Sequence, residues 1–387
     1  INEFPEIHLF VIGKAKEGGK ILKQISDLNL EGKISFHSGL SQSELVSLYS
    51  SAQISVIPSL YEGFGFGAGE AMACGLPLIS TQSGGLKEVV GQDAVIIEAG
   101  SSKAIAEAIK NLFLDKERQL SLSKLGRQRM ENKFNWTKAA KGYEEYLKNH
   151  PRHELVGHGH YGLGLCYFNL KRYDEAAAQL TKAINSKGPD KATANLILGQ
   201  ALLNQKTADP KKAEAAFDRS LKSLGLVKTG LLNRSWNEEK VSAWVKANED
   251  EDKLKDAASA VQGLVDALYM RQEWKPLISV NNAFATVVKG SDAQQRVRVM
   301  TGEAHERNGN FKAAAVAYEA AANQKGGDAA EALFRLGRVR LDNLRAYEKA
   351  AENFADFIKQ QRNSPLRADA AFNEALCYYQ GYYGGNA

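Results

Sequence analysis

The sequence is short of cysteine, of long apolar runs and of net charge. Its only cysteines are Cys74, Cys166 and Cys377, too few and too far apart for a disulfide framework or a four-ligand zinc site. We therefore expect reduced thiols in protein cores and no metal site. No apolar run approaches the roughly 18 residues that cross a bilayer, and the N-terminus lacks the charged-then-apolar pattern of a secretory signal.

The small net charge is unevenly placed along the 387 residues. Residues 1–150 hold 17 basic and 17 acidic side chains, so the whole excess of +5 lies after residue 150. That excess is spread out, with no interleaved aromatic and basic residues, and we predict no nucleic-acid partner. Residues 1–150 also hold 16 of the 34 glycines, whereas the later part is rich in alanine, leucine and lysine. This change predicts an α/β domain followed by an all-α region.

Residues 1–150 alternate short apolar runs with helical patterns. The run 7–12, stopped by Gly13, is typical of a strand buried on both faces of a parallel sheet. Further strands are expected at 34–36 and 54–57, and a helix opening on a serine cap is expected at 41–51. The alternation predicts a doubly wound, Rossmann-like α/β sheet, in which ligands bind beyond the carboxyl ends of the strands.

A glycine-rich loop follows the third expected strand. Between Glu62 and Glu70 every second residue is glycine, and a helix is expected to start near Gly67. Bare backbone N–H groups at a helix N-terminus form an anion site suited to a diphosphate. Glu70, about one turn into that helix, can accept hydrogen bonds from the vicinal hydroxyls of a ribose. Such a loop alone is a weak signal, but the two flanking acids favour a binding site over a tight turn.

The same residues resemble the family 4 glycosyltransferases, retaining enzymes of the two-domain GT-B fold. The family signature places two glutamates eight positions apart, as Glu62 and Glu70 are, and continues as in 70–77, EAMACGLP. Three further segments match: FHSG at 36–39, GGLKEVV at 84–90 and FNW at 134–136. The resemblance covers residues 1 to about 148. It implies the C-terminal, donor-binding half of the fold, a nucleoside-diphosphate sugar as donor substrate, and no cofactor or essential metal.

The resemblance also implies a role for each matching residue. Glu70 would bind the ribose hydroxyls, and Glu62 would contact the transferred sugar and stabilise charge at its anomeric carbon. Gly13 would lie close to the nucleotide. Backbone groups of the loop would contact the diphosphate and the sugar: Gly63, Phe64, Gly65, Phe66 and Gly67.

Two parts of such an enzyme are expected before residue 1. The family's arginine and lysine that neutralise the diphosphate come from the strand and loop just upstream, and its acceptor domain precedes those. We therefore expect the natural protein to be longer at its N-terminus. The 387 residues by themselves are expected to bind donor weakly and to transfer nothing.

After residue 150 the sequence repeats itself. Small and aromatic residues are spaced as in tetratricopeptide repeats, which are pairs of antiparallel helices of about 34 residues. Gly164 and Ala176 would let the first pair approach closely, and copies follow around Gly199, Gly302 and Gly337. We expect a solenoid with repeats at 151–225 and 293–387, and an irregular helical segment at 226–292 that hides one repeat around Leu268 and Trp274.

Two functions remain open at this point. In the first, a sugar nucleotide-dependent transferase uses its repeats to recruit a protein, a peptide or the acceptor in the repeat groove. In the second, the repeats form an interaction scaffold, and the glycosyltransferase-like domain is non-catalytic or artificially joined. We expect a cytoplasmic location; the inner membrane surface and, for the repeats, the cell envelope remain alternatives.

Overall fold

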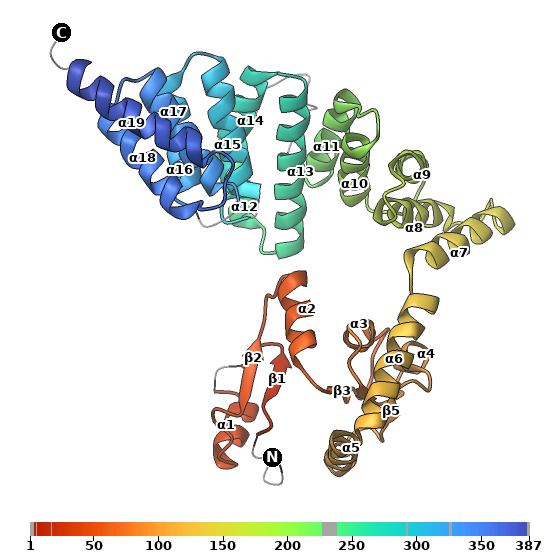
Figure 1. Cartoon of the computed structure of the whole chain (residues 1–387). Coiled ribbons are helices and arrows are strands. Elements are labelled where there is room, and N and C mark those ends of the chain that lie inside the picture. The colour runs from red at the N-terminus through yellow and green to blue at the C-terminus, as the bar shows by residue number, and fades with distance from the viewer. Residues whose placement is uncertain are drawn as a thin grey trace. The chain divides into compact units, whose positions relative to one another are not determined.

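The computed structural model describes residues 4, 6–16, 18–226, 238–291, 293–324 and 327–384. Contacts between Cα atoms divide the chain into two compact units, Ile1–Asn135 and Trp136–Ala387 (Figure 1). The boundary between the units lies after residue 135 and not at the predicted residue 150, because α7 (Trp136–Asn149) packs on α8 (Val156–Asn169) of the second unit. The boundaries predicted at 226 and 292 border or fall on residues outside the described part.

In the described part of the first unit, five short strands form two parallel sheets. In one sheet β1 (Leu9–Ile12) pairs with β2 (Ile34–His37). In the other, β4 (Leu78–Ser80) lies between β3 (Ser55–Ile57) and β5 (Val95–Ile96). The strands are parallel as predicted, but the single doubly wound sheet is divided.

Because the sheet is divided, the first strand is exposed where we predicted that it is buried. The first strand is not buried on both faces: Leu9 is 46% and Ile12 50% exposed, and the following helix α1 (Lys20–Asp27) buries none of its residues. A doubly wound sheet has the strand order 3-2-1-4-5-6, with the first strand in the middle. The observed orders β2-β1 and β3-β4-β5 correspond to 3-2 and 4-5-6. Within the described residues no strand fills the central position, so β1 has a partner on one edge only.

Helices of the first unit connect these strands and form its core. The capping box predicted at Ser41 is present, because Ser41 accepts from the Glu44 N–H and Glu44 accepts from the Ser41 N–H. Met72, Leu86 and Met130 pack together in a core next to β4. The remaining helices are α2 (Gln42–Ser51), α3 (Phe66–Ala73), α4 (Leu86–Val90), α5 (Ser102–Leu114) and α6 (Lys116–Lys133).

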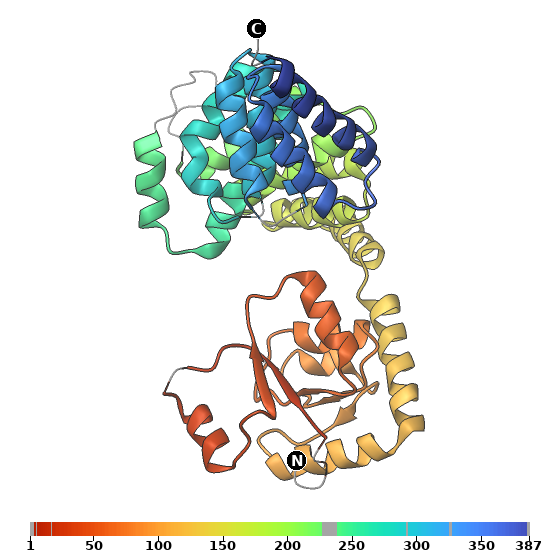
Figure 2. The ribbon, with the colours of Figure 1, turned by 60° about the vertical axis from the view of Figure 1, so that its left-hand side comes forward.

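The described part of the second unit is an array of antiparallel helix pairs, followed in sequence from green to blue in Figures 1 and 2. Each pair packs on the next. The pairs are α8 with α9 (Tyr173–Asn185), α10 (Lys191–Asn204) with α11 (Pro210–Ser223), α13 (Glu251–Met270) with α14 (Trp274–Val288), α15 (Ala293–Arg307) with α16 (Phe311–Ala322), and α17 (Ala329–Asp342) with α18 (Tyr347–Gln360). Two further helices are α12 (Glu238–Ala247) and α19 (Arg367–Gly384).

Glycine lets the helices of a pair approach, as the repeat pattern predicts. A Cβ atom added at Gly302 would lie 2.5 Å from the ring of Tyr318, and one at Gly337 would lie 2.8 Å from the ring of Phe354. Gly164 faces Leu180 in the same way. Any side chain at these positions would push the two helices apart.

The predicted irregular segment does contain a helix pair. Gln272, with φ 57°, turns the chain two residues before Trp274 opens α14. Lys171 adopts φ 58° two residues before Tyr173 opens α9, so the two turns are built alike. A helix pair, α13 and α14, is therefore present around Leu268 and Trp274, where we expected a hidden repeat.

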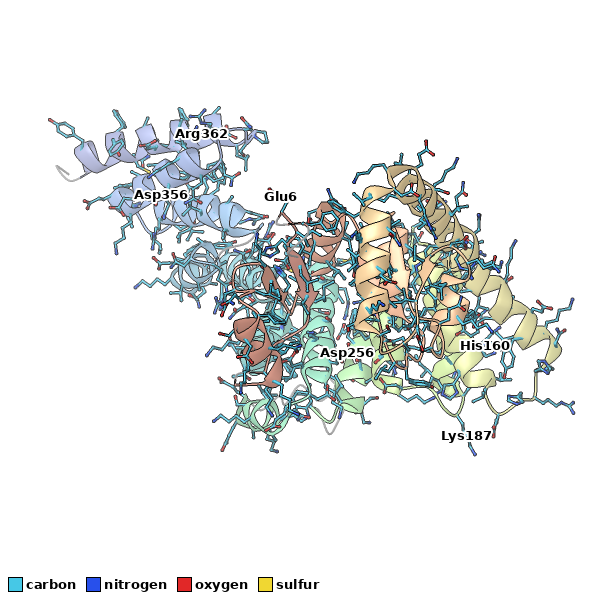
Figure 3. All side chains as sticks on the ribbon, turned by 90° about the horizontal axis from the view of Figure 1, so that it is seen from below. Glu6, His160, Lys187, Asp256, Asp356 and Arg362 are labelled. Atoms are coloured by element: carbon cyan, nitrogen blue, oxygen red, sulfur yellow. The ribbon has the colours of Figure 1, made fainter. Side chains whose placement is uncertain are left out.

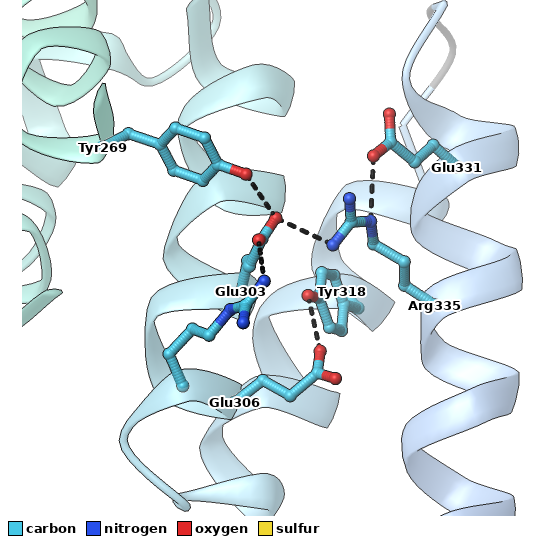
Figure 4. Close-up of polar contacts among 7 residues, drawn as sticks. Tyr269, Glu303, Glu306, Tyr318, Glu331 and Arg335 are labelled. Atoms are coloured by element: carbon cyan, nitrogen blue, oxygen red, sulfur yellow. Dashed lines mark hydrogen bonds and ion pairs between the residues drawn. The ribbon is translucent and has the colours of Figure 1, made fainter. Parts of the chain in front are cut away.

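A polar network crosses the array where one apolar cluster ends and another begins. One cluster reaches from Ala140 to Ala304 and the next from Val299 to Val339, so both include residues of α15. Glu303 of α15 accepts from the Tyr269 hydroxyl of α13 at 2.8 Å and from Arg335 of α17 at 2.8 Å (Figure 4). The Glu303 carboxylate thus links three successive pairs.

Candidate functional site

The loop from β3 to α3 carries the predicted site and depends on one left-handed residue. Gly65 caps α3 with φ 97° and ψ 50°, a conformation that favours glycine. A Cβ atom there would also lie 2.5 Å from Leu86 Cδ2. The helix starts at Phe66, and no side chain caps it. Its first N–H groups are therefore available to an anion.

The loop that follows β4 holds the glycine-rich loop in place. The Gly85 N–H donates to the Glu62 carbonyl oxygen at 2.8 Å, and the Thr81 hydroxyl donates to the Ser59 carbonyl oxygen at 2.7 Å. A Cβ atom at Gly84 would lie 2.3 Å from the Glu62 oxygen, and one at Gly85 would lie 2.2 Å from the Gly63 oxygen. The two backbones thus touch where only glycine fits, and this contact fixes the main chain of Glu62.

Glu70 is positioned by a residue that the sequence analysis missed. The Tyr49 hydroxyl of α2 donates to Glu70 Oε2 at 3.3 Å and lies 3.4 Å from the Gly67 carbonyl oxygen. Burial, and then the negative charge of Glu70, raises the pKa of Tyr49 above its usual range, so the hydroxyl stays protonated. No local pattern indicates this contact, because Tyr49 lies on a different helix, 21 residues before Glu70.

Aromatic side chains line the outer side of the loop. Phe64 packs on Phe66, with ring centroids 4.9 Å apart, and on the edge of Phe134 at 5.9 Å. Phe66 is nevertheless 72% exposed. The loop therefore presents an apolar rim beside the uncapped helix N-terminus.

Gly13 belongs to the other sheet. It follows β1, and its N–H donates to the His37 carbonyl oxygen at 2.7 Å. Among the described residues no hydrogen bond joins Gly13 to the glycine-rich loop. The structure brings the loop residues and Glu70 into one site and does not link Gly13 to it, so the proximity of Gly13 to the nucleotide stays a prediction.

His160 and Arg129 form contacts away from the glycine-rich loop. His160, labelled in Figure 3, hydrogen-bonds Gln179 at 2.8 Å. Arg129 of α6 binds carbonyl oxygens of α4 through Val89 and Glu88, at 2.6 and 2.7 Å. In the described part of the chain no three His, Cys, Asp or Glu side chains form a group suited to a metal. Of the three free cysteines, Cys74 is half-buried rather than in a core.

Comparison with known proteins matches the two folding units to different families. Residues 1–129 match the family described as glycosyl transferases group 1, and 132–189, 299–354 and 334–381 match tetratricopeptide repeats. The chain carries a group 1 glycosyltransferase domain. Tetratricopeptide repeats follow it, as the sequence predicts. No helix in the described ranges is long and apolar enough to span a membrane.

Curated relatives of the glycosyltransferase domain are considerably longer than the matched segment. An MMP alpha-(1->4)-mannosyltransferase of Mycolicibacterium hassiacum is 36% identical over 138 residues, which are 35% of this chain and 34% of that one. The capsular polysaccharide biosynthesis glycosyltransferase CapM of Staphylococcus aureus is 37% identical over 112 residues, 27% and 30% of the two chains. The chain thus spans about a third of these relatives.

A solved structure matches over a similar share. The sucrose-phosphate synthase of Thermosynechococcus elongatus is 29% identical over 38% of this chain and 39% of that chain, with a TM-score of 0.35. Such a score supports no structural argument, and the family assignment depends on sequence alone.

Proposed function

We propose that the group 1 domain binds a nucleoside-diphosphate sugar and transfers the sugar with retention of configuration, while the repeats recruit a protein partner or the acceptor. One observation carries the proposal: the glycine-rich loop leads into the uncapped N-terminus of α3 with Glu70 fixed one turn inside. That arrangement provides anion and hydroxyl recognition side by side.

Donor binding follows from the backbone of the loop. The first N–H groups of α3 and its helix dipole attract the diphosphate, and the glycines let it approach the main chain. Glu70 accepts hydrogen bonds from the ribose hydroxyls. The Tyr49 hydroxyl holds one of its carboxylate oxygens and is a positioning residue rather than a ligand.

Glu62 is the proposed catalytic residue. Its main chain is anchored by the Gly85 N–H, so its side chain leaves the loop from a fixed point. A carboxylate beside the transferred sugar accepts a hydroxyl hydrogen bond and stabilises positive charge developing at the anomeric carbon.

The divided sheet is consistent with the expectation that this segment transfers nothing alone. We place the diphosphate-neutralising cations on a central strand between β1 and β3, the position that no described residue fills. With that strand the site would include the loop after β1. Without it the backbone N–H groups alone attract the diphosphate, while the carboxylates of Glu62 and Glu70 repel it, so the donor binds weakly.

Calorimetric titration of the 387-residue chain with nucleoside diphosphates and their sugar conjugates tests the donor site. We expect weak binding that Glu70→Gln reduces by more than about tenfold, because hydrogen bonds to a charged group contribute about 1.5–3 kcal/mol. Tyr49→Phe should reduce it less. Glu107→Gln, on the exposed side of α5, is the matched control and should leave binding unchanged. Equal binding by the Glu70→Gln variant would contradict the proposed site.

The second candidate is a repeat scaffold whose glycosyltransferase-like domain is non-catalytic or artificially joined. The observation that favours it is the lack of a described contact between Gly13 and the loop. It predicts no binding of any nucleoside diphosphate in the same titration. Detectable sugar transfer by the chain alone would overturn both the scaffold and our expectation that the segment is inactive.

A further inference from the structure

A groove runs along α15, between α14 and α16. Both of these helices pack on α15, and the three are drawn together in Figure 1. The cavity measures about 380 Å³, within the usual range of about 300–1,000 Å³ for ligand sites. Its α15 lining runs from Gln294 to His305, which is about 16 Å of helix and room for about five residues of extended chain. We call this cavity the α15 groove.

The α15 groove opens on the side of α15 opposite the Glu303 network. Arg298, Thr301 and His305 line it and recur at helical spacing along one face. Glu303 follows Thr301 by two residues, or about 200° of helical turn, and contacts α13 and α17. The groove is therefore formed with the second helices of two successive pairs, and it is a separate surface from the network.

Small apolar side chains form the α16 wall of the groove, namely Ala313, Val316, Ala317 and Ala320. We aligned α9, α16 and α18 on the aromatic residue that opens each helix. At the corresponding positions the other two helices carry exposed charged side chains: Glu175 and Lys182 in α9, and Lys349, Glu352 and Asp356 in α18. The outer face of α16 lacks these charges, so another chain can lie directly against the helix.

The floor of the groove is open because a leucine is replaced there. In α8, α10 and α17 a buried leucine precedes the glycine that faces the paired helix: Leu163, Leu198 and Leu336. In α15 this residue is Thr301, which is only 2% exposed and donates its hydroxyl to the Val297 carbonyl oxygen at 2.7 Å. Threonine is shorter than leucine and its hydroxyl is already satisfied. The floor therefore holds space where the other pairs hold a core side chain.

Arg298 gives the floor a positive charge without a carboxylate partner in the described part of the chain. Its guanidinium donates to the Ala320 carbonyl oxygen at 3.1 Å, and no aspartate or glutamate lines the groove. The other arginines of α15 and α17 all form ion pairs: Arg296, Arg307, Arg335, Arg338 and Arg340. A half-buried guanidinium keeps donors available in a fork that suits a carboxylate. The charge of the groove is therefore complementary to an acidic occupant.

The α14 wall suits the backbone of a peptide. Asn281 and Asn282 line the groove, and the only hydrogen bond between their side chains in the described structure is a long one of 3.5 Å. Each amide offers both donors and an acceptor, as a peptide backbone requires. We propose that the α15 groove binds an extended peptide segment of a partner protein, with an aspartate or glutamate side chain of that segment on Arg298. This inference rests on the partner recruitment proposed above for the repeats, and it is independent of the donor site.

Fluorescence anisotropy with the 387-residue chain tests the proposal. The probes are labelled, end-blocked pentapeptides with glutamate at the centre and varied uncharged residues around it, and each has a counterpart with glutamine at the centre. We expect a subset of the glutamate peptides to bind. Their glutamine counterparts should bind more than about tenfold more weakly, because the charge-assisted hydrogen bonds to Arg298 are lost.

Two variants address the groove itself. Arg298→Met should weaken the binding of the glutamate peptides by more than about tenfold and remove their advantage over the glutamine peptides. Thr301→Leu places in the floor the residue that α8, α10 and α17 carry, so it should exclude the peptide while the repeats stay folded. Arg296→Met is the matched control: it removes the same charge from the same helix, but Arg296 pairs with Asp266 outside the groove, so binding should be unchanged. Far-ultraviolet circular dichroism checks that all three variants keep their helices.

Three results would overturn the proposal. The first is a chain that binds none of the glutamate peptides. The second is binding that survives both Arg298→Met and Thr301→Leu; the peptide then lies on another face, and the partner recruitment proposed for the repeats still stands. The third is an equal loss in Arg298→Met and Arg296→Met, because net charge alone then attracts the peptide. The donor titration concerns the first unit, and its outcome is separate from all three.

Discussion

At Gly84 and Gly85 of the glycosyltransferase domain, glycine brings one backbone against another, whereas at Gly302 and Gly337 of the repeats it brings a helix backbone against a ring. A Cβ atom at Gly85 would lie 2.2 Å from the Gly63 carbonyl oxygen, and one at Gly302 would lie 2.5 Å from a ring carbon of Tyr318. The two Cβ distances are similar, but the neighbouring atoms differ in how far they can move. A ring can turn or shift with its helix, while a loop carbonyl that holds the site cannot. An added methyl group should therefore cost more unfolding free energy at Gly85 than at Gly302, although both positions are similarly crowded.

The largest effect is expected from Gly85→Ala. The added methyl group displaces the loop that holds Glu62, so the domain should lose about 3 kcal/mol of unfolding free energy, and donor binding should be abolished. All four tryptophans follow residue 135. Fluorescence therefore reports the repeats and serves as an internal control, while circular dichroism follows both units. Unchanged donor binding by this variant would show that the loop carbonyl can move as easily as a ring.

A smaller but substantial effect is expected from Arg335→Met in the repeats. Glu303 is only 7% exposed, and the substitution removes one of its charged partners. Arg307 at 3.4 Å and the Tyr269 hydroxyl still bind Glu303, so its buried charge is compensated only in part, and we expect a loss of about 2–3 kcal/mol, measured by urea unfolding with tryptophan fluorescence. The double variant with Glu303→Gln should recover part of this loss. If it recovers none, the network does not act as a unit.

Gly337→Ala should cost less than Gly85→Ala although both positions are crowded. The methyl group meets the Phe354 ring at 2.8 Å, and alanine gains about 1 kcal/mol in helix propensity over glycine. We expect a net loss of about 1 kcal/mol in urea unfolding. Adding Phe354→Leu should relieve the crowding, so the two substitutions together should not be additive. A loss equal to that of Gly85→Ala would show that rings are as unyielding as loop carbonyls.

The smallest effect is expected from Arg338→Ala. Arg338 pairs with Asp342 at 2.8 Å, four residues on along the same exposed helix face. Exposed pairs of this kind contribute less than about 0.5 kcal/mol, so urea unfolding should be almost unchanged. A loss near that of Arg335→Met would mean that exposure does not separate the two arginines.

Features formed by residues that are close together in the sequence could be predicted from the sequence. The spacing of Glu62 and Glu70, the glycines between them and the Ser41 cap are all local, and each predicted an element at the observed place. The repeat pattern likewise predicted that Gly164, Gly302 and Gly337 lie in helical repeats, where the structure places each of them against a residue of the paired helix. In the irregular segment, the expectation of a repeat around Leu268 and Trp274 corresponds to the pair α13 and α14.

Long-range contacts were beyond that reasoning. Tyr49 reaches Glu70 from another helix, and the backbone contact of Gly85 with Glu62 joins loops of two strands. The run 7–12 predicts a strand buried on both faces and β1 is exposed, because an apolar run indicates that a strand is suited to burial and does not show that the elements that would cover it are present. The roles of Gly13 and of each loop residue remain predictions that the titration must decide.

The carboxylate of Glu303 has a mechanical consequence. Its hydrogen bonds to Tyr269 and Arg335 hold three helix pairs together at α15, where one apolar cluster ends and the next begins. Pulled from its C-terminal end, the array should release α19 and α18 in turn and then pause before α17 yields, because Arg335 of α17 must first leave Glu303. The force needed to extend the array should therefore be highest at this polar contact rather than at the C-terminal helices.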